Sequence, residues 1–228
     1  MKTYKLLAFL AGAVLILPAC SSDDDEKEPE PVDLRKEFVY CPDINHPHVI
    51  DMGEAGKWSC RNVGAINPTD YGEYYAWGET GTKTDYTRNT YKHYVDGENP
   101  PYKNIGNDIQ ATKYDAATEK WKSPWKMPTN EQMEKLINNC THQWTSFDGV
   151  YGYVFTSPAG NSIFLPAGGR YNKSNNDGIK DKKGFYWTST FSPNTEDGSY
   201  AYFFFIDETS PRMKEGNRVL GNSIRPVQ

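Results

Sequence analysis

The fold of this chain is set by the run Tyr200-Ala201-Tyr202-Phe203-Phe204-Phe205-Ile206, which is apolar at odd and even positions alike. Successive side chains of a strand point to opposite faces, so both faces of this run need to be covered. The run therefore predicts a central strand of a sheet. Residues 185–189 predict another strand, and residues 223–227 are a candidate for the strand that closes the sheet.

Two further apolar runs, residues 153–156 and 162–165, flank the Gly- and Pro-containing loop 157–161. A short loop of this composition between two β-rich runs predicts a hairpin. Long polar segments at 171–183 and 192–199 separate the remaining predicted strands. Loops of that length in a compact domain are usually functional or mobile, so these two segments are candidates for function.

One helix is clearly indicated after Pro128. Thr129 can cap it, and Gln132 stands three residues further on, as in a capping box. Apolar residues then recur at helical spacing and should face the core: Met133, Leu136 and Ile137. The helix is expected to end near Asn139 or Cys140.

A weaker helical signal covers residues 108–121, where three alanines favour a helix and Asn107 or Asp108 could cap it. Helical periodicity is otherwise scarce, while 19 Gly, 15 Pro and 16 Tyr are spread along the chain. We therefore expect an α+β fold that is rich in loops, with short mixed or antiparallel strands and one or two helices. Residues 34–228 are long enough to form a single domain with a sizeable core.

Seven short motifs lie in order along residues 57–228: 62–65 (NVGA), 71–80 (YGEYYAWGET), 125–129 (WKMPT), 139–140 (NC), 163–169 (IFLPAGG), 186–189 (YWTS) and 221–227 (GNSIRPV). As an ordered set they resemble the Fibrobacter succinogenes major paralogous domain, a family abundant in exported Bacteroidetes proteins. Lys126 and Thr188 stand where that family usually has arginine and serine. The resemblance implies a C-type-lectin-like fold, in which the chain ends pair near each other and a long irregular loop region forms a binding face.

The physical role of these motif residues is expected to be mostly structural. Arg225, close to the C-terminus, should donate hydrogen bonds to carbonyls rather than act in catalysis. Four tryptophans should fill a core that lacks long helices, and each indole N–H needs one partner: Trp58, Trp77, Trp125 and Trp187.

Residues 1–19 have the pattern of an export signal. Two lysines precede an apolar stretch, residues 6–17, that is too short to cross a bilayer. The stretch ends in Leu17-Pro18-Ala19-Cys20, which resembles the bacterial lipobox, where the cysteine is lipidated and becomes the new N-terminus. We therefore expect a lipoprotein signal peptide at 1–19 and membrane attachment through a lipid on Cys20; an ordinary secretory signal is the alternative.

Residues 20–33 are expected to form an acidic tether, because charge and proline leave too little apolar surface to fold. The run 23–26 resembles the surface-export signal of Bacteroidetes lipoproteins, or else it is only a solvated spacer. Both roles can hold together, and we expect a lipid-anchored protein of the outer membrane that is exposed on the cell surface. Most of the formal net charge of −5 lies in the tether, so residues 34–228 are nearly neutral and lack the basic stripe of a nucleic-acid-binding protein.

Three cysteines follow Cys20, and export would place them where disulfides form. Cys41–Cys60 is the favoured pair, which leaves Cys140 as a buried thiol at a helix end. No pair has the CxxC spacing of a zinc site, and neither a metal nor a cofactor is expected.

No catalytic residues are expected either. The sequence has no Gly-x-Ser-x-Gly motif, and Cys140 has no recognisable partner histidine. Residues 172–181 are rich in oxygen donors but do not follow the EF-hand spacing, so a polar turn is favoured over a calcium site. A carboxylate pair for glycoside hydrolysis stays open, since separation in space decides it.

Binding is therefore the leading functional hypothesis, with a glycan or a protein as the ligand. A structural or assembly role in the cell envelope is the second hypothesis, and a cryptic hydrolase is the third. The expected binding face comprises loops 171–183 and 192–199, although the same residues could be solvated turns without a partner. The candidate contact residues are Tyr171, Asn175, Asp177, Trp187, Asn194 and Glu196.

Overall fold

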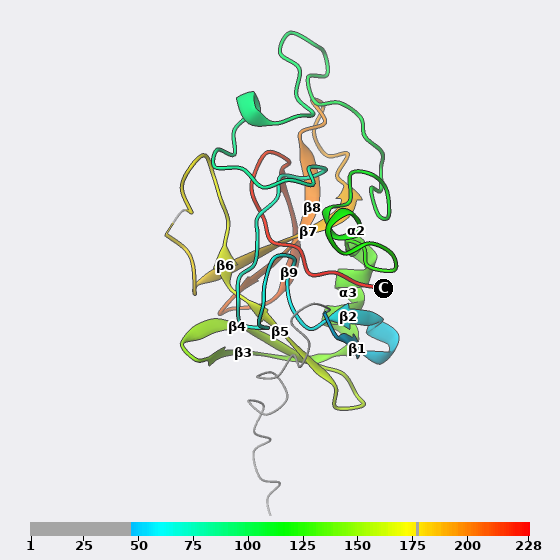
Figure 1. Cartoon of the computed structure of the whole chain (residues 1–228), viewed down its shortest axis with the longest axis vertical. Coiled ribbons are helices and arrows are strands. Elements are labelled where there is room, and N and C mark those ends of the chain that lie inside the picture. Colours follow the sequence, from blue (N-terminus) through cyan, green and yellow to red (C-terminus); the bar gives the residue numbers. More distant parts are fainter. Residues whose placement is uncertain (1–46, 177) are drawn as a thin grey trace, which may run out of the picture. The chain divides into compact units, whose positions relative to one another are not determined.

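The computed structural model describes residues 47–176 and 178–228, which belong to one compact unit, Asp33–Gln228. This part of the chain is a mixed α+β structure with nine short strands and two α-helices, joined by long loops (Figure 1). The expectation of a loop-rich α+β fold is confirmed at this level. None of the helices in the described ranges is long and apolar enough to cross a membrane.

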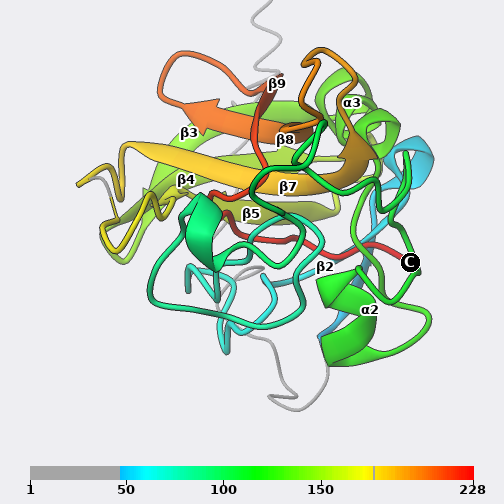
Figure 2. The same cartoon turned by 90° about the horizontal axis from the view of Figure 1, so that it is seen from above.

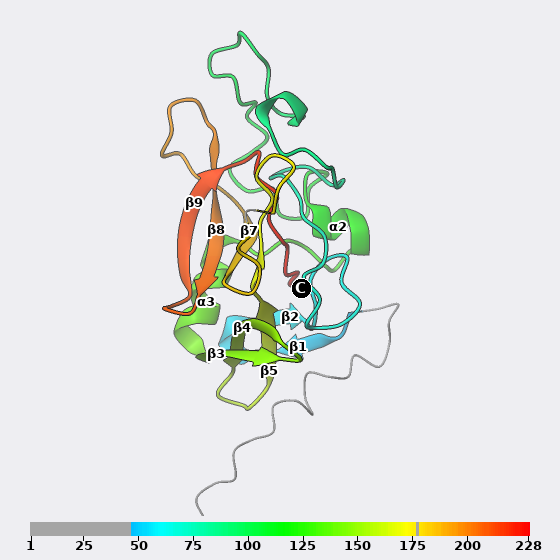
Figure 3. The same ribbon diagram turned by 90° about the vertical axis from the view of Figure 1, so that its left-hand side faces the viewer.

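The main sheet has the strand order β6-β7-β8-β9, so β8 is an inner strand as predicted. It contains β6 (Gly168–Gly169), β7 (Lys183–Phe191), β8 (Tyr200–Asp207) and β9 (Arg212–Asn217). β7 and β9 both pair antiparallel with β8, and Figure 3 shows the three strands side by side. β9 was not predicted, because its residues are mostly polar. It forms a strand through its pairing with β8.

A second sheet, β3-β4-β5, contains the predicted hairpin. Its strands are β3 (Thr141–Phe147), β4 (Val150–Thr156) and β5 (Ser162–Pro166), all antiparallel. β1 (Val49–Asp51) and β2 (Lys57–Ser59) form a separate two-stranded ribbon, with the short 3-10 turn η1 (Gly53–Ala55) between them.

Each face of β8 faces a different part of the core. On one face, Phe204 and Ile206 pack with Tyr186 and with the helix residues Met133 and Leu136. On the opposite face, Phe203 and Phe205 belong to a cluster that contains the alanines of α2 (Ala116–Trp121). Figure 2 accordingly shows the two helices on different sides of β7. The apolar character of β8 on both faces is thereby explained.

α3 (Asn130–Asn139) forms as predicted. The Thr129 hydroxyl accepts the Gln132 N–H at 3.1 Å, and the Gln132 side chain accepts the Thr129 N–H at 2.9 Å. This is the reciprocal capping box expected from the sequence. Met133 and Leu136 are buried, and Cys140, directly after the helix, is a buried thiol.

α2 begins eight residues later than the start expected from the sequence, and its cap is Asp115 rather than Asn107 or Asp108. The Asp115 carboxylate is fully buried and accepts three backbone N–H groups, from Ala111, Thr118 and Met127, at 2.9 to 3.0 Å. Each buried N–H needs a partner, and the Asp115 carboxylate provides one for all three. These hydrogen bonds stabilise a helix that begins after Asp115 more than additional helical turns before it would. Residues before Asp115 turn away to pair with the main sheet, where the Ile109 N–H donates to the Ser189 carbonyl.

Residues 223–227 do not form a strand. They make isolated bridges instead, Ser223 beside Tyr186 and Val227 beside both Trp58 and Lys126. The segment therefore joins β7, β2 and the chain before α3 without belonging to any sheet. The expectation that it would close the sheet as a strand was wrong.

Arg225 lies in this segment with its side chain fully buried. Its guanidinium donates to Asn62 Oδ1 at 2.8 Å, to the Ser59 carbonyl at 3.1 Å and to the Phe164 carbonyl at 2.6 Å. Burial lowers the pKa of Arg225 to about 10, so the group stays charged at neutral pH. The predicted structural role of Arg225 is confirmed.

The tryptophans also behave as predicted. Trp58, Trp77 and Trp187 have no exposed surface, and Trp125 is 7% exposed. The three fully buried indoles each donate to a backbone carbonyl, of Ala55, Thr188 and Tyr75 respectively, at 2.7 to 2.9 Å. Their burial therefore leaves no indole N–H without a partner.

We expect Arg225→Lys to lower the free energy of unfolding by about 2–4 kcal/mol, since one ammonium cannot reach all three acceptors and leaves buried oxygens unpaired. Arg88→Lys is the matched control, because Arg88 is exposed at the surface. It should cost less than about 1 kcal/mol. Urea unfolding of both variants measures the difference, and equal losses would contradict the proposed role of Arg225.

Candidate binding surface

The two predicted binding loops lie at opposite ends of β7. Loop 171–183 precedes the strand and loop 192–199 follows it, so the nine residues of β7, roughly 27 Å of strand, separate their attachment points. No hydrogen bond or ring contact joins the described residues of the two loops. The structure therefore supports two separate surfaces rather than the single face expected. Asp177 lies outside the described residues.

Trp187 was expected to contact a ligand, and that expectation was wrong. The side chain has no exposed surface, its indole N–H donates to the Tyr75 carbonyl at 2.7 Å, and its ring packs edge-on against Phe203. A ring enclosed in this way has no face left for a ligand. Trp187 is a core residue.

Tyr171 and Asn175 have structural explanations. The Tyr171 ring lies 4.9 Å from the Tyr74 ring and 5.6 Å from the Tyr86 ring, measured between centroids, and its backbone pairs with Gly221. Asn175 is exposed, and its backbone closes a tight turn with Asn172. This end of β7 fits the alternative of a solvated turn.

Loop 192–199 is held in shape by its own polar groups. The Ser199 N–H donates to Thr195 Oγ1 and to Asp197 Oδ1, both at 3.0 Å. The Asn194 amide donates to Glu215 of β9 at 2.8 Å, which fastens the loop to the sheet. Asn194 is thus an anchor, while Glu196 is exposed and has no such bond among the described residues.

A cavity of about 220 Å³ lies beside this loop. Tyr102, Ile105 and Phe191 line its apolar part together with two prolines, and its polar lining groups are Asn104, Thr195, Glu196 and Arg218. The walls come from three separate stretches of chain, residues 100–105, residues 191–198 and Arg218. Of the predicted contact residues that the structure describes, only Glu196 lines this cavity.

Arg218 fixes two of these walls to each other. Its guanidinium donates to the Gly198 carbonyl at 3.0 Å and, through both terminal nitrogens, to the Lys103 carbonyl at 3.1 and 3.2 Å. The group is 1% exposed and stacks on Trp77, with 4.7 Å between the guanidinium carbon and the ring centroid. The cavity is therefore preformed, because its loops are bonded to one rigid cation.

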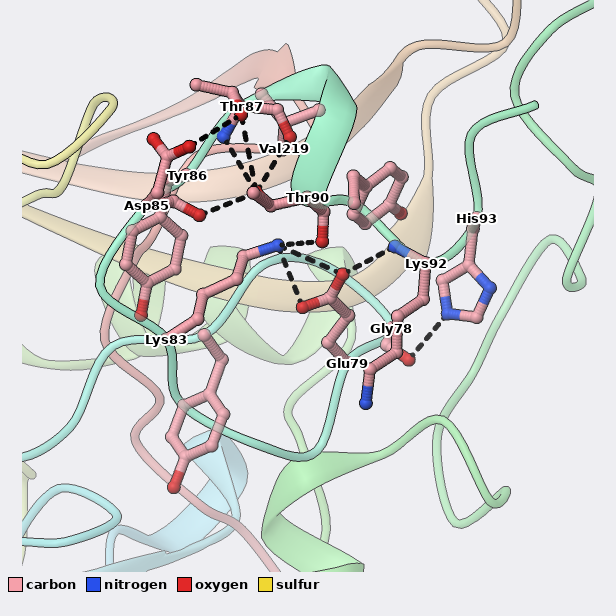
Figure 4. Close-up of polar contacts among 12 residues, drawn as sticks. Gly78, Glu79, Lys83, Asp85, Tyr86, Thr87, Thr90, Lys92, His93 and Val219 are labelled. Atoms are coloured by element: carbon pink, nitrogen blue, oxygen red, sulfur yellow. Dashed lines mark hydrogen bonds and ion pairs between the residues drawn. The ribbon is translucent and has the colours of Figure 1, made fainter. Parts of the chain in front are cut away.

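A mostly buried ion pair between Glu79 and Lys83 fixes the neighbouring loop, residues 79–92 (Figure 4). The Glu79 carboxylate accepts the Lys83 ammonium at 2.9 and 3.0 Å and the Lys92 N–H at 2.8 Å, and the Glu79 side chain is 2% exposed. The Lys83 ammonium also donates to the Thr90 carbonyl at 3.1 Å. These bonds hold in place Tyr91, whose hydroxyl accepts a hydrogen bond from Arg218.

The described residues contain no group of three or more His, Cys, Asp or Glu side chains placed to hold a metal ion. Asp181, the last residue of the oxygen-rich segment 172–181, accepts a hydrogen bond from the Tyr71 hydroxyl at 2.5 Å. Burial raises the pKa of the Cys140 thiol to about 11, so it is protonated at neutral pH. Cys41 lies outside the described residues, and its pairing with Cys60 stays a prediction.

Three comparisons with known proteins gave no match to this chain, either among protein-family models, among curated proteins or among solved structures. Sequence reasoning found Glu196 through the length of its loop but missed Tyr102, Phe191 and Arg218. Nothing in the local sequence around those three indicates that they meet.

We expect Glu79→Gln to lower the free energy of unfolding by about 2 kcal/mol, because the Lys83 ammonium, mostly buried, would lose its carboxylate. Glu119→Gln is the control, since Glu119 pairs with Lys122 in solvent and should change stability by less than about 0.5 kcal/mol. Chemical denaturation compares the two. A loss for Glu79→Gln no larger than that of the control would show that the ion pair does not hold the loop.

Proposed function

We propose that this protein is a non-catalytic binding module of the cell surface, which holds one ring or side chain of a glycan or protein ligand in the cavity beside loop 192–199. The observation that carries the proposal is the preformed cavity, walled by Tyr102, Phe191 and Pro193 and fixed by Arg218. Apolar walls with a few polar groups at defined positions are typical of small-ligand sites.

The size of the cavity limits what it can hold. At about 220 Å³ it is smaller than the roughly 300–1,000 Å³ of sites that enclose a whole drug-sized ligand. It therefore suits the terminal unit of a larger molecule. A sugar ring or an apolar side chain would pack on the aromatic and proline walls, while Asn104 and Glu196 would bond its polar groups.

The motif resemblance described above supports the same function, because a C-type-lectin-like fold would use irregular loops as its recognition face. A lipid on Cys20 and the acidic tether would hold such a domain at the outer membrane, facing outward. Cys20 and residues 21–33 lie outside the described residues, so this part of the proposal depends on the sequence.

The ligand can be sought by glycan-array and pull-down binding with the exported protein. Glu196→Ala should weaken binding of whichever ligand is found by at least about fivefold, because it removes the exposed carboxylate of the cavity. Asn175→Ala, at the opposite end of β7, is the matched control and should change affinity less than twofold. Both exposed substitutions should change the free energy of unfolding by less than about 0.5 kcal/mol. Loss of binding in Asn175→Ala alone would place the site on loop 171–183 and refute this assignment.

Membrane attachment is tested by Cys20→Ala. The variant should leave the membrane fraction while its domain keeps the wild-type melting temperature, because the lipid is the proposed anchor and Cys20 precedes the proposed domain, residues 34–228. Fractionation of cells that express each form gives the result. A variant that stays in the membrane fraction would show that Cys20 is not the anchor.

A further inference from the structure

A larger groove, of about 460 Å³, lies away from the cavity proposed above. It is lined by Gly53, Glu54, Asn139, Ser157, Pro158 and Ala159. These residues come from the η1 turn, from the C-terminal end of α3 and from the loop between β4 and β5, which lie together at the lower right of Figure 1. The volume falls within the range of small-ligand sites.

The Ser157 side chain carries a polar atom without a partner in the described part of the chain. The residue is 4% exposed, and its hydroxyl oxygen is buried and makes no hydrogen bond within the described residues. Its backbone is fully engaged, because its N–H donates to the Asn161 carbonyl at 2.8 Å and its carbonyl accepts the Gly160 N–H at 2.9 Å. A buried hydroxyl without a partner costs free energy, so a group entering the groove that bonded it would be favoured.

The end of α3 presents further acceptors. No hydrogen bond from outside the helix reaches the carbonyls of residues 136–139 among the described residues, and the last turn contains no basic side chain. The C-terminal end of a helix carries partial negative charge on these carbonyls. The helix end at the groove therefore lacks the positive charge that would complement it.

The other lining residues add a negative charge and an apolar wall. Glu54 adds an exposed carboxylate, and none of the six lining residues that the structure describes is basic. Pro158 and Ala159 supply an apolar wall. The groove thus combines acceptors of hydrogen bonds, negative charge and an apolar surface.

From these contacts we propose that the groove binds a primary ammonium group on an apolar stem, such as the side chain of a lysine in a partner protein or peptide. An ammonium has three N–H donors and no acceptor, which matches the Ser157 hydroxyl oxygen, the helix carbonyls and the Glu54 carboxylate. The methylene stem would pack on Pro158 and Ala159. This site is independent of the cavity beside loop 192–199 and of its ligand.

The probe for this site is n-butylamine, titrated into the full-length protein and followed by NMR chemical shifts. The neutral analogue 1-butanol and the anionic analogue pentanoate carry the same four-carbon stem. We expect saturable binding of the amine, at least about tenfold tighter than that of the alcohol, and no binding of pentanoate. Absence of saturable amine binding, or equal affinity for the alcohol, would overturn the proposal.

Substitutions locate the binding. Glu54→Gln and Ser157→Ala should each weaken the amine at least about fivefold. Glu131→Gln, on the first turn of the same helix with its side chain 76% exposed, should leave the affinity unchanged, as should Glu196→Ala in the other cavity. The melting temperature of each variant is measured to confirm folding. Unchanged affinity in Glu54→Gln, which lies at the surface and keeps the fold, would overturn the assignment even if Ser157→Ala were destabilised.

Discussion

The buried guanidinium of Arg225 is the interaction on which the rest of this domain depends. The guanidinium donates hydrogen bonds to three separate segments: to the Ser59 carbonyl of β2, to the Asn62 side chain just after β2 and to the Phe164 carbonyl of β5. These segments are more than 50 residues apart from Arg225 in sequence, and no shared sheet connects all of them. Burying a cation costs free energy unless its donors are bonded, and here oriented carbonyls and an amide do this without a carboxylate. The C-terminal segment is thereby fixed in the middle of the fold although it forms no strand.

Arg218 has a similar role near the loops, where its buried guanidinium also donates to backbone carbonyls. A domain with few helices and long loops has many backbone carbonyls outside regular ladders, and each needs a donor. The planar guanidinium supplies several donors in a fixed geometry, so one side chain can bond two loops at once. Arg218 does so for Lys103 and Gly198, while Glu79 and Lys83 fix the loop that carries Tyr91. The walls of the cavity are therefore rigid even though they are irregular. Less conformational entropy of the loops is then lost when a ligand binds.

The features that local sequence could predict are those whose causes are local. The two-sided apolar run of β8 and the capping box of α3 both lie within ten residues, and both formed as expected. The predicted start of α2 was wrong because Asp115 also accepts a hydrogen bond from the N–H of Met127, twelve residues away. Helix propensities describe only local sequence and do not include such a contact. β3 and β9 are polar strands that exist because a neighbouring strand pairs with them. For the same reason the cavity could not be predicted, since Tyr102, Phe191 and Arg218 meet only in the folded chain.

The two ends of α3 differ in a way that bears on function. At its N-terminus, Thr129 and Gln132 form a capping box and the Asn130 N–H donates to the Thr190 hydroxyl at 3.0 Å, so the first turn is anchored to β7. At its C-terminus, about 15 Å away, no basic side chain lies in the last turn, and the Ser157 hydroxyl beside the groove has no partner among residues 47–176 and 178–228. Folding alone would favour satisfying both ends, because the acceptors of a helix end gain from a donor as its N–H groups do. The N-terminal end is bonded within the protein, whereas the C-terminal end still offers its acceptors to a group from outside.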